Sequence, residues 1–150
     1  MQIIIRTRKT QPGPIIGHYT VDGEPIPQSR PRFGNGHVYS DQHQEKQGVQ
    51  IQLVHQHAGY QLFTGALKLD VTFFMPVRYK QRLKEGIATY HKVKPDLDNL
   101  IKFLLDCCNT ILFKDDNQIS IIFARKIYSA LPRTEFTITK IGEHDETETV

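Results

Sequence analysis

The chain between Lys94 and Leu112 reads KPDLDNLIKFLLDCCNTIL. Its apolar residues recur at intervals of three and four, which is typical of one face of an α-helix. Aspartate is a favoured residue at a helix start, because its side chain accepts hydrogen bonds from backbone N–H groups that have no partner there. The stretch therefore predicts a helix that begins near Asp98, with Asp98 as its cap, and runs to about Leu112.

Apolar patterns on both sides of this helix predict β-strands and one further helix. The expected strands are 15–23, 37–39, 67–73, 119–128 and 134–141, and the other helix runs from Ser40 or Asp41 to about Ala58. Strands mixed with two unevenly placed helices indicate a single small α+β domain, with a mixed or antiparallel sheet packed against two main helices. We expect the domain to span 15–142, after an N-terminal arm (1–14) and before a disordered acidic tail (143–150).

Carboxylates on either side of the predicted helix are candidates for a metal site. Asp96 and Asp98 stand where the chain enters the helix, and Asp115 and Asp116 stand in the loop after it. If that loop folds back toward the helix start, the acids converge, and their repulsion favours a bound cation. Mg²⁺ takes such oxygen ligands, with Mn²⁺ as the alternative ion, and a bound metal activates water for phosphodiester hydrolysis. Lys102, one turn beyond Asp98, would neutralise the phosphate or hold the attacking water.

The same aspartates also have an ordinary structural interpretation. Aspartate is common at helix starts and in turns that bind no metal, so spacing alone leaves both interpretations open. Asp106 lies one further turn beyond Lys102, and we expect it to pair with that lysine.

The charge distribution favours a polyanionic partner. The formal net charge is +3, and without the four carboxylates of the last eight residues it rises to +7 on residues 1–142. Many soluble proteins are mildly basic, so charge alone does not establish nucleic-acid binding. The candidate DNA-binding residues are Arg30, Arg32, Arg78, Lys80, Arg82, Lys92 and Lys94.

Several other features bound the class of protein. No apolar run approaches the length of a membrane helix, and no signal peptide is evident, so we expect a cytoplasmic location. Cys107 and Cys108 are adjacent and fit helix packing in a reducing compartment. Exposed aromatics at an opened DNA branch would stack on bases, although most aromatics are core residues; the candidates are Phe33, Tyr39, Tyr79 and Tyr90.

Two ordered blocks of sequence resemble the RusA family of Holliday junction resolvases, in its phage type. The first is PIPQSRPRF at 25–33 with GHVYS at 36–40, and the second is KPDLDNL at 94–100 with Lys102, Asp106 and DDNQI at 115–119. Together these matches extend over about residues 18–141. In place of the strongly basic run that some members carry before the first aspartates, this chain has HKVKP at 91–95.

The resemblance implies a metal-dependent endodeoxyribonuclease that resolves four-way junctions in recombination and repair by paired symmetric cuts. It implies metal ligation by Asp96, Asp98 and Asp116, with Asp115 beside them, and a catalytic role for Lys102. Because the substrate is two-fold symmetric, we expect a homodimer. The alternatives are a nuclease acting on flaps or other branched DNA, and a catalytically inactive module that binds junctions.

Overall fold

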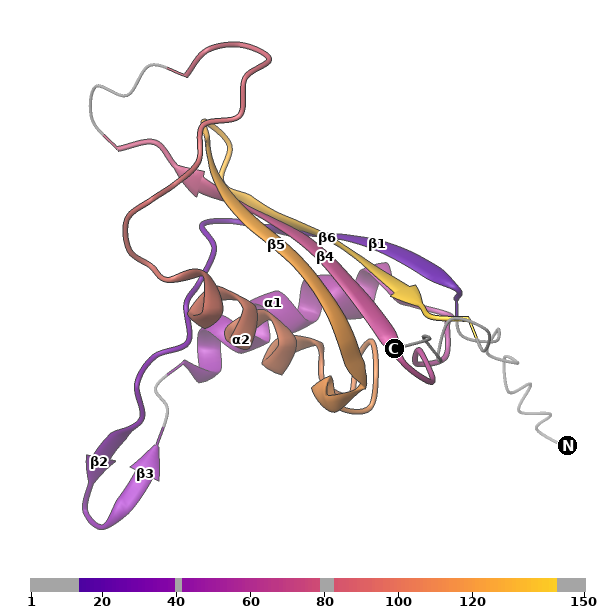
Figure 1. Cartoon of the computed structure of the whole chain (residues 1–150). Coiled ribbons are helices and arrows are strands. Elements are labelled where there is room, and N and C mark those ends of the chain that lie inside the picture. Colours follow the sequence, from indigo (N-terminus) through magenta and orange to yellow (C-terminus); the bar gives the residue numbers. More distant parts are fainter. Residues whose placement is uncertain (1–13, 40–41, 79–82, 143–150) are drawn as a thin grey trace, which may run out of the picture.

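Four strands form one mixed sheet in the computed structural model, which describes residues 14–39, 42–78 and 83–142 (Figure 1). The sheet has the order β1-β6-β4-β5. β6 pairs antiparallel with β1 and β4, whereas β5 pairs parallel with β4. The strands are β1 (Ile16–Asp22), β4 (Leu67–Pro76), β5 (Ile119–Ser129) and β6 (Arg133–Lys140). The mixed sheet and the two main helices confirm the predicted α+β class.

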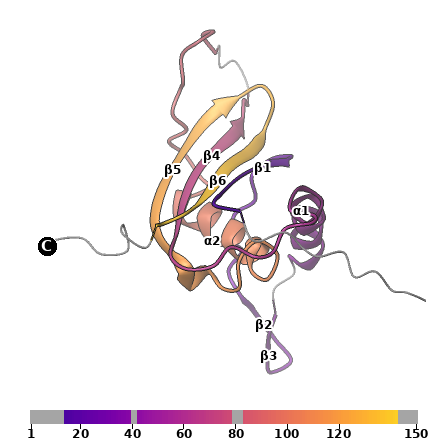
Figure 2. The ribbon, with the colours of Figure 1, turned by 90° about the vertical axis from the view of Figure 1, so that its right-hand side faces the viewer.

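The hydrophobic core lies between one face of the sheet and the two helices. Alternate residues of β4 are buried on that face, from Leu67 to Met75. α1 (His43–Gln56) and α2 (Leu97–Cys108) lie against the same face (Figures 1 and 2). α2 contributes six buried side chains, including both cysteine thiols, and α1 contributes only Val49 and Leu53. α2 is therefore the helix that fixes the core, as its apolar pattern predicts.

The predicted ends of both helices need correction. The first residue of α2 is Leu97, and its N-cap is Asp96, so the prediction of Asp98 as the cap is wrong. α2 ends at Cys108, before the predicted Leu112, because Thr110 has a φ of 67° that cannot continue a helix. α1 has Gln42 as its N-cap residue, so neither predicted cap stands next to the helix; Ser40 and Asp41 themselves lie outside the described residues.

A two-stranded hairpin, β2 (Arg32–Gly34) and β3 (His37–Tyr39), projects away from the sheet and helices (Figure 1). Its turn residues Asn35 and Gly36 have φ values of 50° and 77°. Positive φ at both positions is the geometry of the tight turn that Asn-Gly favours, so the predicted turn is confirmed.

Some predictions fall on residues that the structure does not describe. They include nearly all of the N-terminal arm, the acidic tail, Lys80 and Arg82. Among the helices of the described ranges, none combines the length and the apolar character needed to cross a bilayer.

Candidate active site

Two exposed carboxylates stand at the N-terminal end of α2. Asp96 is the N-cap residue in an extended conformation, and Asp98 belongs to the first turn. Asp96 makes no capping hydrogen bond with its side chain in the described structure. The free N–H groups of the first helical turn favour negative charge at this place. Both carboxylates are therefore exposed to solvent, and the N-cap carboxylate is not used as a structural cap.

The loop that leads into Asp96 is fixed by a lysine of β5. Lys126 Nζ donates hydrogen bonds to the backbone oxygens of Val93 and Pro95, each at 2.6 Å. The backbone oxygen of Lys126 also accepts from the N–H of His91 at 3.0 Å. Lys126 thus sets the position of the residue just before Asp96. Nothing in the sequence singled it out, because a lysine in a strand otherwise reads as a solvent-facing residue.

A second segment, residues 27–29, is attached to the same turn of α2 from the other side. The N–H of Gln28 donates to the backbone oxygen of Asn99 at 2.9 Å. The buried side chain of Gln42 accepts from the N–H of Ser29 and donates to the oxygen of Pro27, both at 2.8 Å. Gln28 Oε1 and Ser29 Oγ are buried without a hydrogen-bond partner among the described residues. These two buried polar atoms belong to the segment that is bonded to the turn carrying the aspartates.

Lys102 is exposed one turn beyond Asp98 on α2. The predicted pairing of Lys102 with Asp106 is wrong, because Asp106 forms an ion pair with Lys46 of α1 at 3.6 Å. That pair joins the two helices, which pack against each other. Lys102 is therefore exposed on α2 without an ion pair to Asp106.

Asp115 and Asp116 lie beyond the opposite end of α2, in and before the short 3-10 helix η1 (Asp116–Gln118). Asp115 caps η1 by accepting from the N–H of Asn117 at 3.3 Å, and Gln118 completes a capping box. Burial raises the pKa of Asp116, and the hydrogen bond and negative charge of Asp115 and the charge of Asp106 raise it further, while a hydrogen bond from Asn109 opposes them. Asp116 thus belongs with residues at the C-terminal end of α2.

The two aspartate pairs are separated within one chain by the length of α2. A helix of 12 residues is about 18 Å long. Consistent with this, no three acidic, histidine or cysteine side chains of the described ranges are close enough together to hold a metal ion. The convergence of all four carboxylates therefore does not occur within a single described chain, and their assignment as metal ligands stays a prediction.

Basic residues border the first aspartate pair. Lys92 and Lys94 are exposed in the loop before Asp96, and Arg30 is exposed on the segment that leads to the hairpin. Arg78 is exposed and forms an ion pair with Glu24 at 2.7 Å. An open pocket of about 350 Å³ adjoins the loop and is lined by residues that include Arg78, His91, Lys94 and Pro95. The pocket is also lined by Glu24, the partner of Arg78, so the exposed lysines of the loop are the basic groups that stand nearest in sequence to the carboxylates.

Comparison with known proteins assigns the family. Residues 22–139 match the family described as endodeoxyribonuclease RusA. This chain is a member of the RusA family. The match includes both aspartate pairs, Lys102, Lys126 and the hairpin, and it confirms the resemblance seen in the sequence.

Two curated proteins are similar to this chain, and the second bears the family's name. The chain is 33% identical over 138 residues to an uncharacterized protein, YqaN, of Bacillus subtilis (strain 168), and the alignment covers 83% of this chain and 96% of YqaN. It is 37% identical over 76 residues to a crossover junction endodeoxyribonuclease, rusA, of Lactococcus phage r1t. That second alignment covers 50% of this chain and 55% of the phage protein.

Proposed function

We propose that this RusA-family chain is a Mg²⁺-dependent endonuclease that resolves four-way DNA junctions as a homodimer, in DNA recombination and repair. The observation that carries the proposal is the pair of exposed carboxylates, Asp96 and Asp98, at the N-terminal end of α2. The side chain of the N-cap residue makes no capping hydrogen bond there, and Lys102 and a basic loop are next to the pair. A phage relative bears the name of a crossover junction endodeoxyribonuclease, which gives the substrate class.

The donor set of the site fits Mg²⁺. This ion commonly binds through one or two carboxylates and keeps several waters, and Asp96 and Asp98 offer two exposed carboxylates at one helical turn. When bound, Mg²⁺ supplies activation of water and charge neutralisation at the scissile phosphate. The chain's own residues attract and orient the DNA: Lys92 and Lys94 contact the backbone, and Lys102 neutralises the negative charge that develops on the phosphate.

Because the two aspartate pairs are separated within one chain, a site that uses both pairs would need a second chain, which supports the homodimer. The edge of the sheet offers a place where that second chain could bind. β5 forms one edge of the sheet, and Ile121, Ile122 and Phe123 are exposed on it, the last to 60%. Residues 89–91 pair with the C-terminal part of β5, through the Tyr90–Ile127 bridge and flanking hydrogen bonds. No other described residue pairs with the outer edge of 119–125. A continuous apolar edge of this kind is a template for pairing with another strand.

Antiparallel pairing of two β5 strands about Ile122 would make the carboxylates converge. Asp116 precedes Ile122 by as many residues as Tyr128 follows it. The Asp115–Asp116 loop of one protomer would therefore approach Tyr128 of the other, and with it the 89–95 loop that leads into Asp96. On this proposal each of two symmetric sites takes one aspartate pair from each chain, which suits two cuts in a two-fold symmetric substrate.

The test is cleavage of a synthetic four-way junction with Mg²⁺ and with EDTA, beside linear duplex and flap substrates of related sequence. We expect paired cuts in the junction with Mg²⁺ only. Asp98→Asn should remove cleavage and retain binding, because it removes a ligand charge and keeps the shape of the side chain. Preferential cutting of the flap would redirect the proposal to other branched DNA. Junction binding by the wild type without any cutting would instead indicate an inactive binding module.

A further inference from the structure

The β2–β3 hairpin presents an aromatic side chain to solvent. Phe33 is 84% exposed, more than any other large hydrophobic side chain of the described residues. It stands on a two-stranded hairpin to which no other strand of the described residues is joined. Arg30 and Arg32 precede it, and both have exposed side chains. An exposed ring preceded by two arginines is suited to an anionic partner that also offers flat apolar surface.

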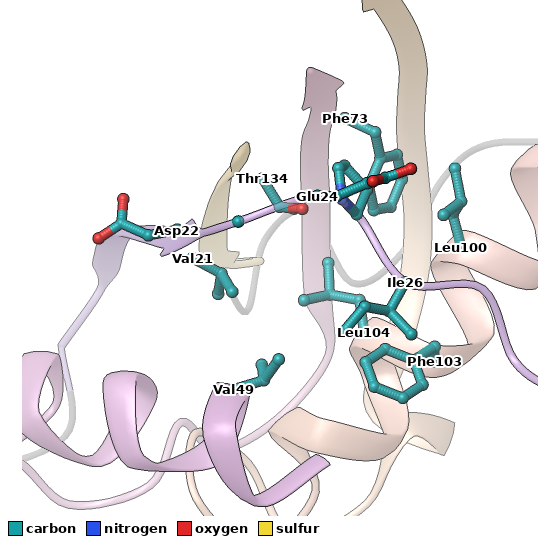
Figure 3. Close-up of a pocket in the computed structure, with 12 residues that line it drawn as sticks. Val21, Asp22, Glu24, Ile26, Val49, Phe73, Leu100, Phe103, Leu104 and Thr134 are labelled. Atoms are coloured by element: carbon teal, nitrogen blue, oxygen red, sulfur yellow. The ribbon is translucent and has the colours of Figure 1, made fainter. Parts of the chain in front are cut away.

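The root of the hairpin is held firmly against α2. Ile26 packs against the core beside Leu100, Phe103 and Leu104 (Figure 3), around a cavity of only about 30 Å³, which is too small for a nucleotide. The next residues are fixed by the hydrogen bond from Gln28 to the first turn of α2 and by those of Gln42. The hairpin therefore leaves the body at a defined place and direction, immediately beside the turn that carries Asp98.

Chain length limits how far Phe33 reaches from that turn. From Ser29 to Phe33 an extended chain spans at most about 13 Å, at about 3.3 Å per residue. Since base pairs repeat every 3.4 Å or so along a duplex, this reach corresponds to about four base-pair steps. Ser29 follows Gln28, which is bonded to the turn that carries Asp98, so a ring within this reach of Ser29 would meet bases within a few steps of the phosphate under attack.

We propose that the hairpin is a wedge that inserts Phe33 at the branch point of the junction and stacks it on an unpaired base. The inference rests on the proposed function and adds the residue that recognises the branch. Branched DNA is the fitting occupant because the ring needs an exposed base face, which intact duplex offers only at its ends, and because guanidinium groups bind phosphates. A second copy of the chain would cover the ring, but it would not meet the positive charge of Arg30 as a phosphate does.

The first experiment uses the absence of tryptophan from the sequence. In Phe33→Trp the single indole reports directly on position 33, and the matched control is Leu131→Trp, at a side chain 69% exposed in the turn between β5 and β6. In EDTA, so that no strand is cut, a four-way junction should quench the fluorescence of Phe33→Trp by stacking. The same junction should leave Leu131→Trp unchanged, and linear duplex should quench Phe33→Trp much less.

The second experiment reads the DNA. A junction that carries 2-aminopurine at the branch point should brighten when the wild type or Phe33→Tyr binds, because the base is unstacked from its neighbours, and should not brighten with Phe33→Ala. Loss of one stacked ring should weaken junction binding by roughly 5- to 150-fold, with duplex binding little changed.

Different failures are distinguishable in these measurements. If the wild type cuts the junction normally while Phe33→Trp is not quenched and Phe33→Ala brightens the probe fully, the wedge is wrong and the nuclease proposal stands. If emission of DNA-free Phe33→Trp shifts to the blue with rising protein concentration, the hairpin is instead a contact between copies. If the wild type neither binds nor cuts the junction, both proposals fail.

Discussion

Removal of the Lys126 ammonium should loosen the loop that carries Asp96. In Lys126→Met the oxygens of Val93 and Pro95 lose the donor that now lies 2.6 Å from each. A hydrogen bond from a charged group contributes about 1.5–3 kcal/mol, and the solvent exposure of the Val93 bond reduces its share, so the pair together stabilises the fold by about 2–3 kcal/mol. For a chain of this size that loss lowers Tm by roughly 4–12 °C.

The same change should slow cleavage more than it weakens binding, because the carboxylate of Asp96, proposed as a metal ligand, is misplaced while the exposed lysines remain. Denaturant unfolding gives the stability, and single-turnover cleavage with separate binding in EDTA gives the functional effects. The control is Lys140→Met, which removes the same charge and only a weak 3.4 Å contact to Thr64. If Lys126→Met unfolds at the same midpoint as Lys140→Met and cleaves at the wild-type rate, Lys126 has no positioning role.

Three further outcomes are expected. Lys102→Ala should lower the rate of single-turnover cleavage by about 10²- to 10³-fold at saturating junction. Lys92→Ala should instead weaken binding and reduce the slope of its salt dependence by about one. If both variants show equal, modest losses of binding with normal turnover, Lys102 is only a surface charge. Phe123→Glu should convert the dimer to monomer at micromolar concentration in light scattering, with Leu131→Glu as the control, and an unchanged mass would place the interface elsewhere. Burial, with the positive charges of Lys126 and Arg78, lowers the pKa of His91 below its usual 6.5. The free energy of unfolding should therefore fall as the pH drops from about 6.5 toward the lower pKa of the folded state. His91→Phe should show less of this fall when unfolding is measured at about pH 7.5 and at about pH 5.

Local patterns in the sequence predict much of the fold, because the apolar residues of β4 and α2 recur at the spacing typical of a strand and of a helix. The alternation from Leu67 to Phe73 gives the central strand β4, and the helical spacing after Asp98 gives α2. Asn35-Gly36 predicts the hairpin turn, since its backbone conformation is one that these two residues adopt at low cost. The family resemblance likewise rests on local blocks and is confirmed over 22–139.

The contacts that position the site could not be predicted in the same way, because they join residues distant in sequence. Lys126 donates a hydrogen bond to the backbone of Pro95, 31 residues away in the sequence. The side chain of Gln42 accepts one from Ser29, although from its position before α1 one would expect it only to cap that helix. Asp106 could pair with Lys102 on its own helix or with Lys46 on α1. Only the packing of α1 against α2 shows that Lys46 is the partner. The sequence supplies the charges in each case, and the tertiary fold decides which pairs form.

On the proposed function, the first turn of α2 is the point at which stability and activity are coupled. Lys126 fixes the residue before the turn, and Gln28 fixes the turn itself through Asn99. Because each anchor comes from a different part of the sequence, the carboxylates of Asp96 and Asp98 are held by the whole fold rather than by the helix alone. A loss of either anchor moves the carboxylates relative to the hairpin and the basic loop. If Asp96 and Asp98 act as proposed, these backbone contacts matter to cleavage as much as the carboxylates do, since small displacements of a positioned reactive group cost large factors in rate.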